Sequence, residues 1–286
     1  MQISGTTTLL GLIGSPVEHS RSPQMYNHCF QKFGLDYAYL AFDVTPDQIE
    51  NAVKAIRTLN LRGANITMPC KAAVIPFLDK ITPAAKAIGA VNTVVNGGGV
   101  LTGHNTDGLG YTQNLRRHGT DVQGKRIVLL GGGGAGSAIT VQAALDGAAE
   151  IAVFNRRDSF WPRVAAAMQA ANAAAPSCKI TLNDLDDREA LQASIEKADI
   201  LSNATRVGMA PLENVSSIDP AFFRPDLVVT DVVYAPPETK MLREAQAAGC
   251  KTCDGLGMLL CQGAEAFRLY SGREMPIEEI RALLYS

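Results

Sequence analysis

Two ionisable side chains stand ahead of a glycine-rich loop in this sequence. Lys71 ends the polar stretch Asn65–Lys71, directly after a predicted strand, and Asp107 lies in the segment Asn105–Gly108. The loop Gly131–Gly136 follows downstream, between a predicted strand and a predicted helix. A lysine and an aspartate can exchange a proton with a reacting hydroxyl or carbonyl group. Their position ahead of a dinucleotide-type loop indicates proton-transfer groups placed beside a nicotinamide.

The glycine loop carries the Gly-x-Gly-x-x-Gly spacing, with Gly131, Gly133 and Gly136 at the three glycine positions. It follows an apolar strand predicted at 127–130 and precedes a helix rich in Ala, Ile and Val. Such glycines permit a tight turn and let backbone N–H groups at the helix start approach a pyrophosphate. In this context, with a second strand predicted at 150–155, the loop predicts a bound dinucleotide. A glycine turn without a ligand is the alternative.

The residues after the second strand bear on the choice between NAD and NADP, and their signals conflict. Arg156 or Arg157 could accept a 2′-phosphate, whereas Asp158 would bond the free ribose hydroxyls and repel that phosphate. Phe160 or Trp161 could flank the adenine, or simply pack. These residues alone leave the cofactor choice open.

Lys71 has a further property that suits it to proton transfer. A helix is expected to begin near Pro69 and Cys70, and the positive end of a helix disfavours a nearby ammonium group. We therefore expect the pKa of Lys71 to fall toward a range useful for catalysis. The alternatives are a solvated surface lysine at position 71 and a helix N-cap at Asp107.

Composition limits the class of protein. The 286 residues are 47% hydrophobic and 19% charged, with a formal net charge of -2, so a well-packed chain of two domains is expected. The balanced charge and the lack of long Lys/Arg runs argue against a nucleic-acid partner. No apolar run reaches membrane-spanning length, so we expect no membrane association and a cytoplasmic location.

The six cysteines suggest neither a disulfide framework nor a metal site. Cys250 and Cys253 form a single Cys-x-x-Cys, and a zinc site needs a second pair of ligands. The histidines offer no such pair at suitable spacing: His19, His28, His104 and His118. We expect two packed thiols and no bound metal.

Short apolar runs alternate with helical patterns along most of the chain. Strands are predicted at 9–13, 37–42, 64–67, 91–95, 100–102, 125–130, 150–155, 179–182, 199–204 and 227–233. A glycine turn at 97–99 predicts a hairpin between the fourth and fifth strands. A helix with Ile49, Val53 and Ile56 on one face begins at Thr45, where Gln48 completes a capping box.

Alternation of strands and helices builds parallel sheets covered by helices on both faces, so a two-domain α/β fold is predicted. We place an α/β domain at 1–106, a Rossmann-type dinucleotide-binding domain at 107–250 and a C-terminal segment at 251–286. That segment contains helices predicted at 258–271 and 276–285, which we expect to pack back on the first domain.

A series of short motifs runs along nearly the whole chain. They are Gly14–Pro16, His19–Pro23, Asn27, Asn65–Lys71, Gly89–Thr93, Asn105–Gly108, the glycine loop, Asn155–Arg157, Asn203–Thr205, Val233–Tyr234 and Gln262–Ala264. Their content and order resemble those of the shikimate/quinate dehydrogenase family. The resemblance implies an N-terminal α/β substrate domain, a Rossmann domain and C-terminal helices that return to the first domain.

The resemblance also implies a reaction and the residues that carry it. The reaction is reversible hydride transfer between a nicotinamide and a ring carbon of shikimate, giving 3-dehydroshikimate; some members also oxidise quinate. The implied substrate-binding residues are Ser20 and Ser22 for the carboxylate, and Thr67, Lys71, Asn92, Asp107 and Gln262 for the ring hydroxyls. Lys71 and Asp107 form the implied catalytic pair. The implied cofactor-binding residues are Gly131, Gly132, Gly133, Gly134, Ala135, Asn155, Arg156, Arg157, Asp158, Thr205, Arg206, Val232, Tyr234 and Gly255.

Two stretches depart from the NADP-specific branch of the family, which usually shows Asn-Arg-Thr or Asn-Arg-Ser after the second strand. Asn155–Phe160 is closer to the dual-specificity quinate/shikimate branch, and Tyr234–Pro236 replaces the frequent Tyr-Asn-Pro. We therefore predict shikimate as the favoured small-molecule substrate, with NAD preferred and NADP usable. The oligomeric state is open, a homodimer included.

Other functions on a similar frame are less well supported by the residues. A strictly NADP-dependent enzyme is the alternative within the same family. A non-catalytic ligand sensor would not need both Lys71 and Asp107, because binding alone requires no proton donor. Oxidation of a folate intermediate is disfavoured by Ser20 and Ser22, which suit a small carboxylate.

Overall fold

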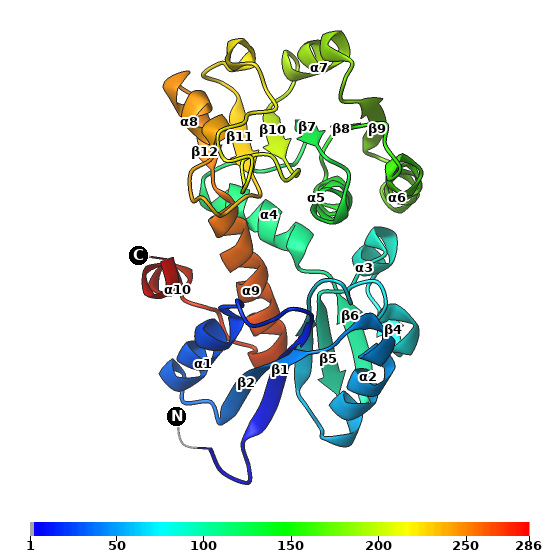
Figure 1. Cartoon of the computed structure of the whole chain (residues 1–286), viewed down its shortest axis with the longest axis vertical. Helices are drawn as coiled ribbons and strands as arrows, with labels where there is room; N and C mark the ends of the chain where they lie inside the picture. Colours follow the sequence, from blue (N-terminus) through cyan, green and yellow to red (C-terminus); the bar gives the residue numbers. More distant parts are fainter. Residues whose placement is uncertain (1–2, 286) are drawn as a thin grey trace. The chain divides into compact units, whose positions relative to one another are not determined.

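The computed structural model describes residues 3–285 and divides the chain into two compact units (Figure 1). The first unit comprises the chain up to Thr106 together with the chain from Gln262 onward, and the second runs from Asp107 to Cys261. Each unit contains its own six-stranded sheet. The predicted two-domain α/β fold is therefore confirmed.

The C-terminal segment begins later than the sequence suggested. Residues Lys251–Cys253 form strand β12 of the second sheet, parallel to its neighbour. Helix α9 (Gly255–Ser271) belongs to the second unit as far as Cys261 and to the first unit from Gln262. Position 251, the predicted start of this segment, is thus still within the second sheet.

The first sheet has the strand order β2-β1-β3-β5-β6-β4. Its strands are β1 (Thr8–Gly14), β2 (Tyr37–Asp43), β3 (Gly63–Ile66), β4 (Lys80–Ile81), β5 (Thr93–Gly97) and β6 (Val100–His104). β1 is parallel to β2 and β3, whereas β5 is antiparallel to β3 and β6. The predicted hairpin is confirmed, with Gly98 and Gly99 at φ of 65° and 95° in its turn. This hairpin reverses the chain, so the first sheet contains both parallel and antiparallel pairs. The short strand β4 was not predicted.

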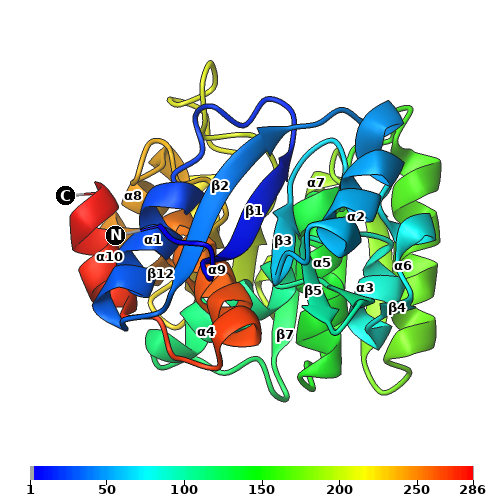
Figure 2. The ribbon, with the colours of Figure 1, turned by 90° about the horizontal axis from the view of Figure 1, so that it is seen from below.

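Helices cover both faces of the first sheet (Figure 2). They are α1 (Ser22–Lys32), α2 (Ile49–Thr58), α3 (Pro83–Ile88) and part of α9, with short 3-10 helices η1 (Pro46–Gln48) and η2 (Ile75–Phe77). Helix α10 (Ile277–Tyr285) packs on α1. The predicted capping box at Thr45 and Gln48 is present, and it opens η1, which leads into α2. α2 buries Ile49, Val53 and Ile56 against the sheet, as its periodicity predicted.

The other face of the first sheet packs on aromatic side chains of α1 and α9. Tyr26 of α1 stacks on Tyr39 of β2, with ring centroids 4.6 Å apart, and on Phe267 of α9 at 6.3 Å. Tyr26 also donates a hydrogen bond to the carbonyl of Gly263 (3.1 Å). This packing fixes the part of α9 that begins at Gln262 against the first sheet.

The second sheet is parallel throughout, in the order β12-β11-β10-β7-β8-β9. Its remaining strands are β7 (Arg126–Leu130), β8 (Glu150–Asn155), β9 (Lys179–Asp184), β10 (Ile200–Asn203) and β11 (Val228–Asp231). The helices are α4 (Asp107–Arg117), α5 (Gly134–Leu145), α6 (Trp161–Ala174), α7 (Arg188–Ile195) and α8 (Lys240–Ala247), with a 3-10 turn η3 (Pro220–Phe222). The strand order is that of the doubly wound Rossmann fold, whose chain changes direction beside β7.

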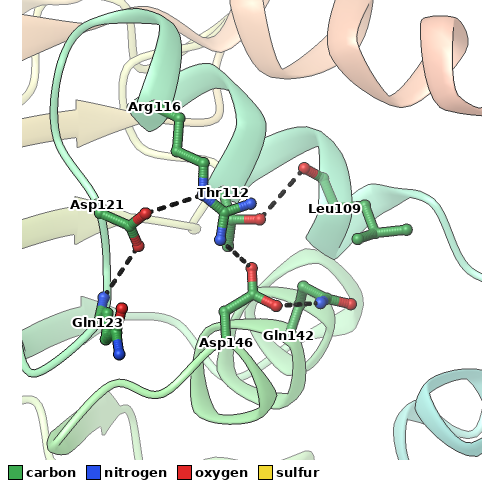
Figure 3. Close-up of polar contacts among 7 residues, drawn as sticks. All are labelled: Leu109, Thr112, Arg116, Asp121, Gln123, Gln142 and Asp146. Carbon is green, nitrogen blue, oxygen red and sulfur yellow. Dashed lines mark hydrogen bonds and ion pairs between the residues drawn. The ribbon is translucent and has the colours of Figure 1, made fainter.

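Helices α4 and α5 of the second unit pack closely along their length. A Cβ on Gly108 would overlap the backbone oxygen of Ala138 and the Cβ of Gln142, so only glycine permits this approach. At the other end Arg116 donates to Asp121 (3.1 Å) and Asp146 (2.8 Å), as Figure 3 shows. The packing fixes the first turn of α4, and with it Asp107, against the helix that follows the glycine loop.

Candidate active site

One edge of the first sheet collects the loops that carry the predicted substrate-binding residues. β1 and β3 end at this edge, and antiparallel pairing brings the start of β5 and the end of β6 to it, since Thr93 is paired with Asn65 and with His104. The predicted residues follow these strand ends or precede β5. They are Ser20 and Ser22 after β1, Thr67 and Lys71 after β3, and Asn92 before β5.

The loops after β1 and β3 are bonded to each other. The backbone N–H of Thr67 donates to Ile13 (2.9 Å), and that of Ser15 donates to Met68 (3.1 Å). A Cβ on Gly14 would overlap the methyl group of Thr67, so this glycine leaves room for the threonine side chain. The half-buried Thr67 is therefore held at a defined place beside the loop that leads to α1.

Ser20 and Ser22 lie close together at the start of α1. The N–H of Ser22 donates to the hydroxyl oxygen of Ser20 (3.2 Å), and both residues are half-buried. Ser22 is the first residue of α1, where backbone N–H groups and the helix dipole favour an anion. The pair can therefore serve a small carboxylate, as the resemblance implied.

Lys71 lies in a run of turns and not at a helix start. Residues 68–74 form turns, and η2 begins only at Ile75. The helix dipole invoked for this lysine is therefore not provided by the local structure, and that prediction was wrong. Its backbone is bonded to the segment before β5, because the N–H of Val91 donates to the carbonyl of Lys71 (2.8 Å). This bond sets the half-buried lysine beside the segment that carries Asn92.

Asn92 is buried, and its side-chain amide is oriented by hydrogen bonds on both sides. Its Nδ2 donates to Thr106 (3.0 Å), and its Oδ1 accepts from the N–H of Thr106 (2.8 Å) and the hydroxyl of Thr93 (3.0 Å). The Thr106 hydroxyl in turn contacts Oε1 of Gln262 at 3.4 Å. The structure thus brings Asn92 and Gln262 together through Thr106, which had not been predicted as a site residue.

A second buried amide, that of Asn65, is linked to Asn92 through the hydroxyl of Thr93. Asn65 accepts a hydrogen bond from the hydroxyl of Tyr39 (2.8 Å) and donates to the hydroxyl of Thr93 (3.1 Å). Neither Asn65 nor Tyr39 was predicted to act at the site. Asn65 opens the Asn65–Lys71 stretch, so a polar residue within a buried strand was the available signal.

The glycine loop lies at the carboxyl edge of the second sheet, beside the central strand β7. Gly131 adopts φ of 90° and donates to the carbonyl of Phe154 (2.8 Å), while a Cβ on Gly136 would overlap the carbonyl oxygen of Gly131. By contrast, a Cβ on Gly133 or Gly134 would meet no described atom within 4 Å, and both glycines are exposed. Gly131 and Gly136 are thus packed against neighbouring backbone, whereas Gly133 and Gly134 leave free space at the start of α5. This free space fits a bound pyrophosphate.

Several residues at and after the end of β8 form hydrogen bonds or ion pairs with one another and with neighbouring loops. Asn155 accepts a hydrogen bond from the N–H of Gly132 (3.1 Å), so it supports the glycine loop. Arg157 pairs with Asp184 at the end of β9 (3.1 Å) and lies over the ring of Trp161, 4.8 Å from its centroid. Asp158 accepts from the N–H of Phe160 (2.9 Å), and Arg156 is exposed.

The loops after β10 and β11 carry the other predicted cofactor residues. Thr205 bonds to Asn203 through its N–H (3.1 Å) and its hydroxyl (2.6 Å), and Arg206 follows in the same loop. The N–H of Val232 donates to the carbonyl of Asn203 (3.0 Å). A Cβ on Gly255 would overlap the carbonyl oxygen of Val232, so α9 begins close against this loop. Tyr234 is exposed on the same loop.

The cysteine pair packs in the interior. Cys250 and Cys253 are both buried and unbonded to each other, and burial raises the pKa of the Cys253 thiol to about 12. Over residues 3–285 no group of three or more His, Cys, Asp or Glu side chains is arranged to hold a metal ion. Within the same residues no helix has the length and apolar content to cross a membrane.

Comparison with known proteins identifies the family. Residues 12–94 match the family model of the shikimate dehydrogenase substrate binding domain, and residues 255–285 match that of the shikimate 5'-dehydrogenase C-terminal domain. A shikimate dehydrogenase (NADP(+)) of Streptococcus uberis is 50% identical over 289 residues, covering 100% of this chain and 98% of the relative. The chain belongs to the shikimate dehydrogenase family.

The similar proteins include both a quinate/shikimate dehydrogenase and a shikimate dehydrogenase of known structure. A quinate/shikimate dehydrogenase of Escherichia coli is 44% identical over 285 residues, which are 99% of this chain and 99% of the relative. The crystal structure of shikimate 5-dehydrogenase from Listeria monocytogenes, in complex with shikimate and NAD, superposes with a TM-score of 0.97 at 46% identity. That alignment covers 100% of this chain and 99% of the other. The predicted family and the predicted class, an NAD(P)-dependent oxidoreductase of the shikimate/quinate dehydrogenase type, are confirmed.

Proposed function

We propose that the protein catalyses the reversible oxidation of shikimate to 3-dehydroshikimate with a nicotinamide dinucleotide, and that quinate is a secondary substrate. The supporting observation is the edge of the first sheet, where Asn92, Thr106 and Gln262 form an oriented set of hydroxyl-binding groups. Ser20 and Ser22 supply the carboxylate-binding end of the same edge. A small carboxylic acid with several ring hydroxyls matches this combination.

Proton transfer is assigned to Lys71 and Asp107. When bound, the nicotinamide accepts the hydride that leaves the carbinol carbon. Lys71 takes the proton from the hydroxyl group on that carbon while the C–OH group becomes C=O, and it returns the proton in the reverse reaction. Asp107 shares that hydroxyl and orients the lysine. The position of Asp107 supports this role, because it directly follows Thr106 and begins the helix that packs on α5.

We assign the cofactor to the carboxyl edge of the second sheet. The N–H groups of Gly133, Gly134 and Ala135 at the start of α5 hold the pyrophosphate, and the residues after β8 hold the adenosine ribose. The loops containing Thr205 and Val232 take the nicotinamide half, since they follow β10 and β11 on the other side of β7. Gly255 permits the close approach of α9 to that half.

NAD is proposed as the preferred cofactor and NADP as a usable one. The 2′-phosphate of NADP would meet the carboxylates of Asp158 and Asp184 as well as the two arginines. Arg157 is already paired with Asp184 and lies over Trp161, so part of its charge is compensated. The cluster therefore offers a phosphate less attraction than two arginines alone would give.

Removing the partner of Arg157 should shift the cofactor preference toward NADP. Asp184→Asn retains a side-chain oxygen for the N–H of Asp186 but loses the charge that pairs with Arg157. Because this pair is exposed, we expect roughly a fivefold rise in the NADP/NAD ratio of kcat/KM, corresponding to about 1 kcal/mol. Steady-state kinetics with shikimate measure the ratio. An unchanged ratio would show that Asp184 does not restrain Arg157, and Asp184→Asn combined with Arg157→Ala should abolish the gain.

Removing the two serine hydroxyls should weaken substrate binding. Ser20→Ala with Ser22→Ala deletes hydrogen bonds to a charged carboxylate, which are worth about 1.5–3 kcal/mol each. We expect KM for shikimate to rise by at least about 100-fold while kcat falls far less. Initial rates over a range of shikimate concentrations, with the melting temperature as control, measure both. A KM close to that of the unaltered protein would place the carboxylate elsewhere.

Limited space at the carboxylate end of the site favours shikimate over quinate as substrate. Quinate carries an extra hydroxyl on the carbon that bears the carboxylate, and that carbon would lie near Ser20, Ser22 and Thr67. The Thr67 methyl group is packed on Gly14, so this side chain cannot easily withdraw. We therefore propose that quinate is accepted less well.

The experiment that tests the proposed function is a set of initial rates of nicotinamide reduction. Shikimate and quinate are each assayed with NAD and with NADP. Turnover of shikimate with NAD supports the whole proposal, and a large advantage of NADP would contradict the cofactor preference. Turnover in none of the four combinations would favour the non-catalytic sensor. The homodimer and the cytoplasmic location stay predictions.

A further inference from the structure

Asp231 is a buried carboxylate that none of the assignments above uses. It is the last residue of β11, and only 3% of its surface is exposed. Its Oδ1 accepts hydrogen bonds from Nδ2 of Asn203 (2.9 Å) and the N–H of Val233 (3.0 Å), and its Oδ2 accepts from the hydroxyl of Thr239 (2.8 Å). One side chain thus joins the end of β10, the loop after β11 and the start of α8.

The carboxylate decides which way the Asn203 amide faces. Burial raises the pKa of Asp231 to about 6, so near neutral pH the carboxylate is ionised and can only accept hydrogen bonds. The NH₂ group of Asn203 must therefore face Asp231, where it also donates to the carbonyl of Val207 (3.0 Å). The amide oxygen is left to accept from the N–H and the hydroxyl of Thr205.

Both loops ordered in this way border the glycine loop on one side of β7. Thr205 lies against Gly131, since a Cβ on that glycine would be 2.9 Å from the Thr205 methyl group. Val232 and Val233 follow Asp231 directly, and the N–H of Val232 is bonded to the backbone of Asn203. In the Rossmann arrangement this side of the central strand faces the half of the dinucleotide that does not carry the adenine.

We infer that Asp231 is a positioning residue for the nicotinamide half of the cofactor, acting through Asn203 on the loops that contain Thr205 and Val232. It does so without touching the cofactor, because it is enclosed by its hydrogen-bond partners. The inference rests on the proposed nicotinamide-dependent function and adds a residue that the sequence motifs did not single out. The adenosine half, held after β8, does not depend on Asp231.

Separate binding measurements with whole and partial cofactor test this role. Asp231→Ala removes both acceptor oxygens, so the Asn203 amide loses the contact that orients it. We expect the dissociation constant of NAD to rise at least tenfold by calorimetry, whereas that of ADP, which lacks the nicotinamide half, changes less than twofold. An equal loss for both ligands, or no loss for either, would overturn the inference.

Two further variants separate positioning from loss of stability. Asn203→Ala keeps the carboxylate but removes the connection to Thr205, so it should reproduce the selective loss of NAD binding even if Asp231→Ala does not fold. Leu191→Ala, a core truncation in α7, should lower the melting temperature and leave both affinities unchanged. A selective loss of NAD binding in Leu191→Ala would also refute the inference. An unaltered protein that binds neither NAD nor NADP would instead contradict the proposed function.

Discussion

Replacing Lys71 with alanine should lower kcat for shikimate oxidation about 1,000-fold and change KM for shikimate much less. A positioned proton-transfer group contributes roughly 10²- to 10⁴-fold, and its contribution arises in the transition state. Ground-state binding is retained by Ser20, Ser22 and Asn92, which the substitution does not alter. Steady-state rates of nicotinamide reduction at saturating cofactor measure both constants.

A matched variant and a chemical rescue test whether the loss belongs to the amine. Lys86→Ala removes an exposed lysine from α3 of the same unit and should leave kcat unchanged. Added methylamine should restore part of the activity of Lys71→Ala, because the truncated side chain leaves room for a small amine. An unchanged kcat in Lys71→Ala would remove this residue from the mechanism.

Replacing Gly136 with alanine should disrupt the cofactor loop and destabilise the second unit. The new Cβ would overlap the carbonyl oxygen of Gly131, which lies in backbone and cannot rotate away as a side chain could. We expect a loss of about 2–3 kcal/mol in the free energy of unfolding, together with a loss of cofactor binding. Denaturant unfolding and calorimetric titration with NAD measure the two effects.

Gly133→Ala provides the contrasting variant three residues earlier. Its Cβ would meet no described atom within 4 Å, and its φ of -68° suits alanine, so the stability should stay within about 0.5 kcal/mol. The methyl group would nevertheless occupy the open side of the loop, where we place the pyrophosphate. NAD affinity should therefore fall at least tenfold, and full affinity in this variant would move the pyrophosphate away from Gly133.

Local patterns along the chain determined much of the fold. The capping box at Thr45 and Gln48, the hairpin at 97–99 and the strand before the glycine loop all depend on neighbouring residues, and all are present. Pairing direction between strands far apart in the chain depends on distant partners, and the antiparallel pairing of β5 with β3 was not predicted. The helix expected near Lys71 is also absent from the described turns at 68–74, because Pro and Cys at 69–70 permit a turn as readily as a helix start.

The candidate site shows the same division. The types and order of Lys71, Asp107 and the glycine loop indicated proton-transfer groups beside a nicotinamide, and the resemblance of the motifs along the whole chain predicted the family and the class of reaction. Tertiary structure alone showed that Thr106 joins Asn92 to Gln262, and that Asp184 pairs with Arg157. It also showed that Asp231 orients Asn203, although neither residue contributes a reactive group. The sequence determined which groups are available, and tertiary structure decided how they are oriented, because hydrogen bonds between residues far apart in the chain form only when strand ends meet at one sheet edge.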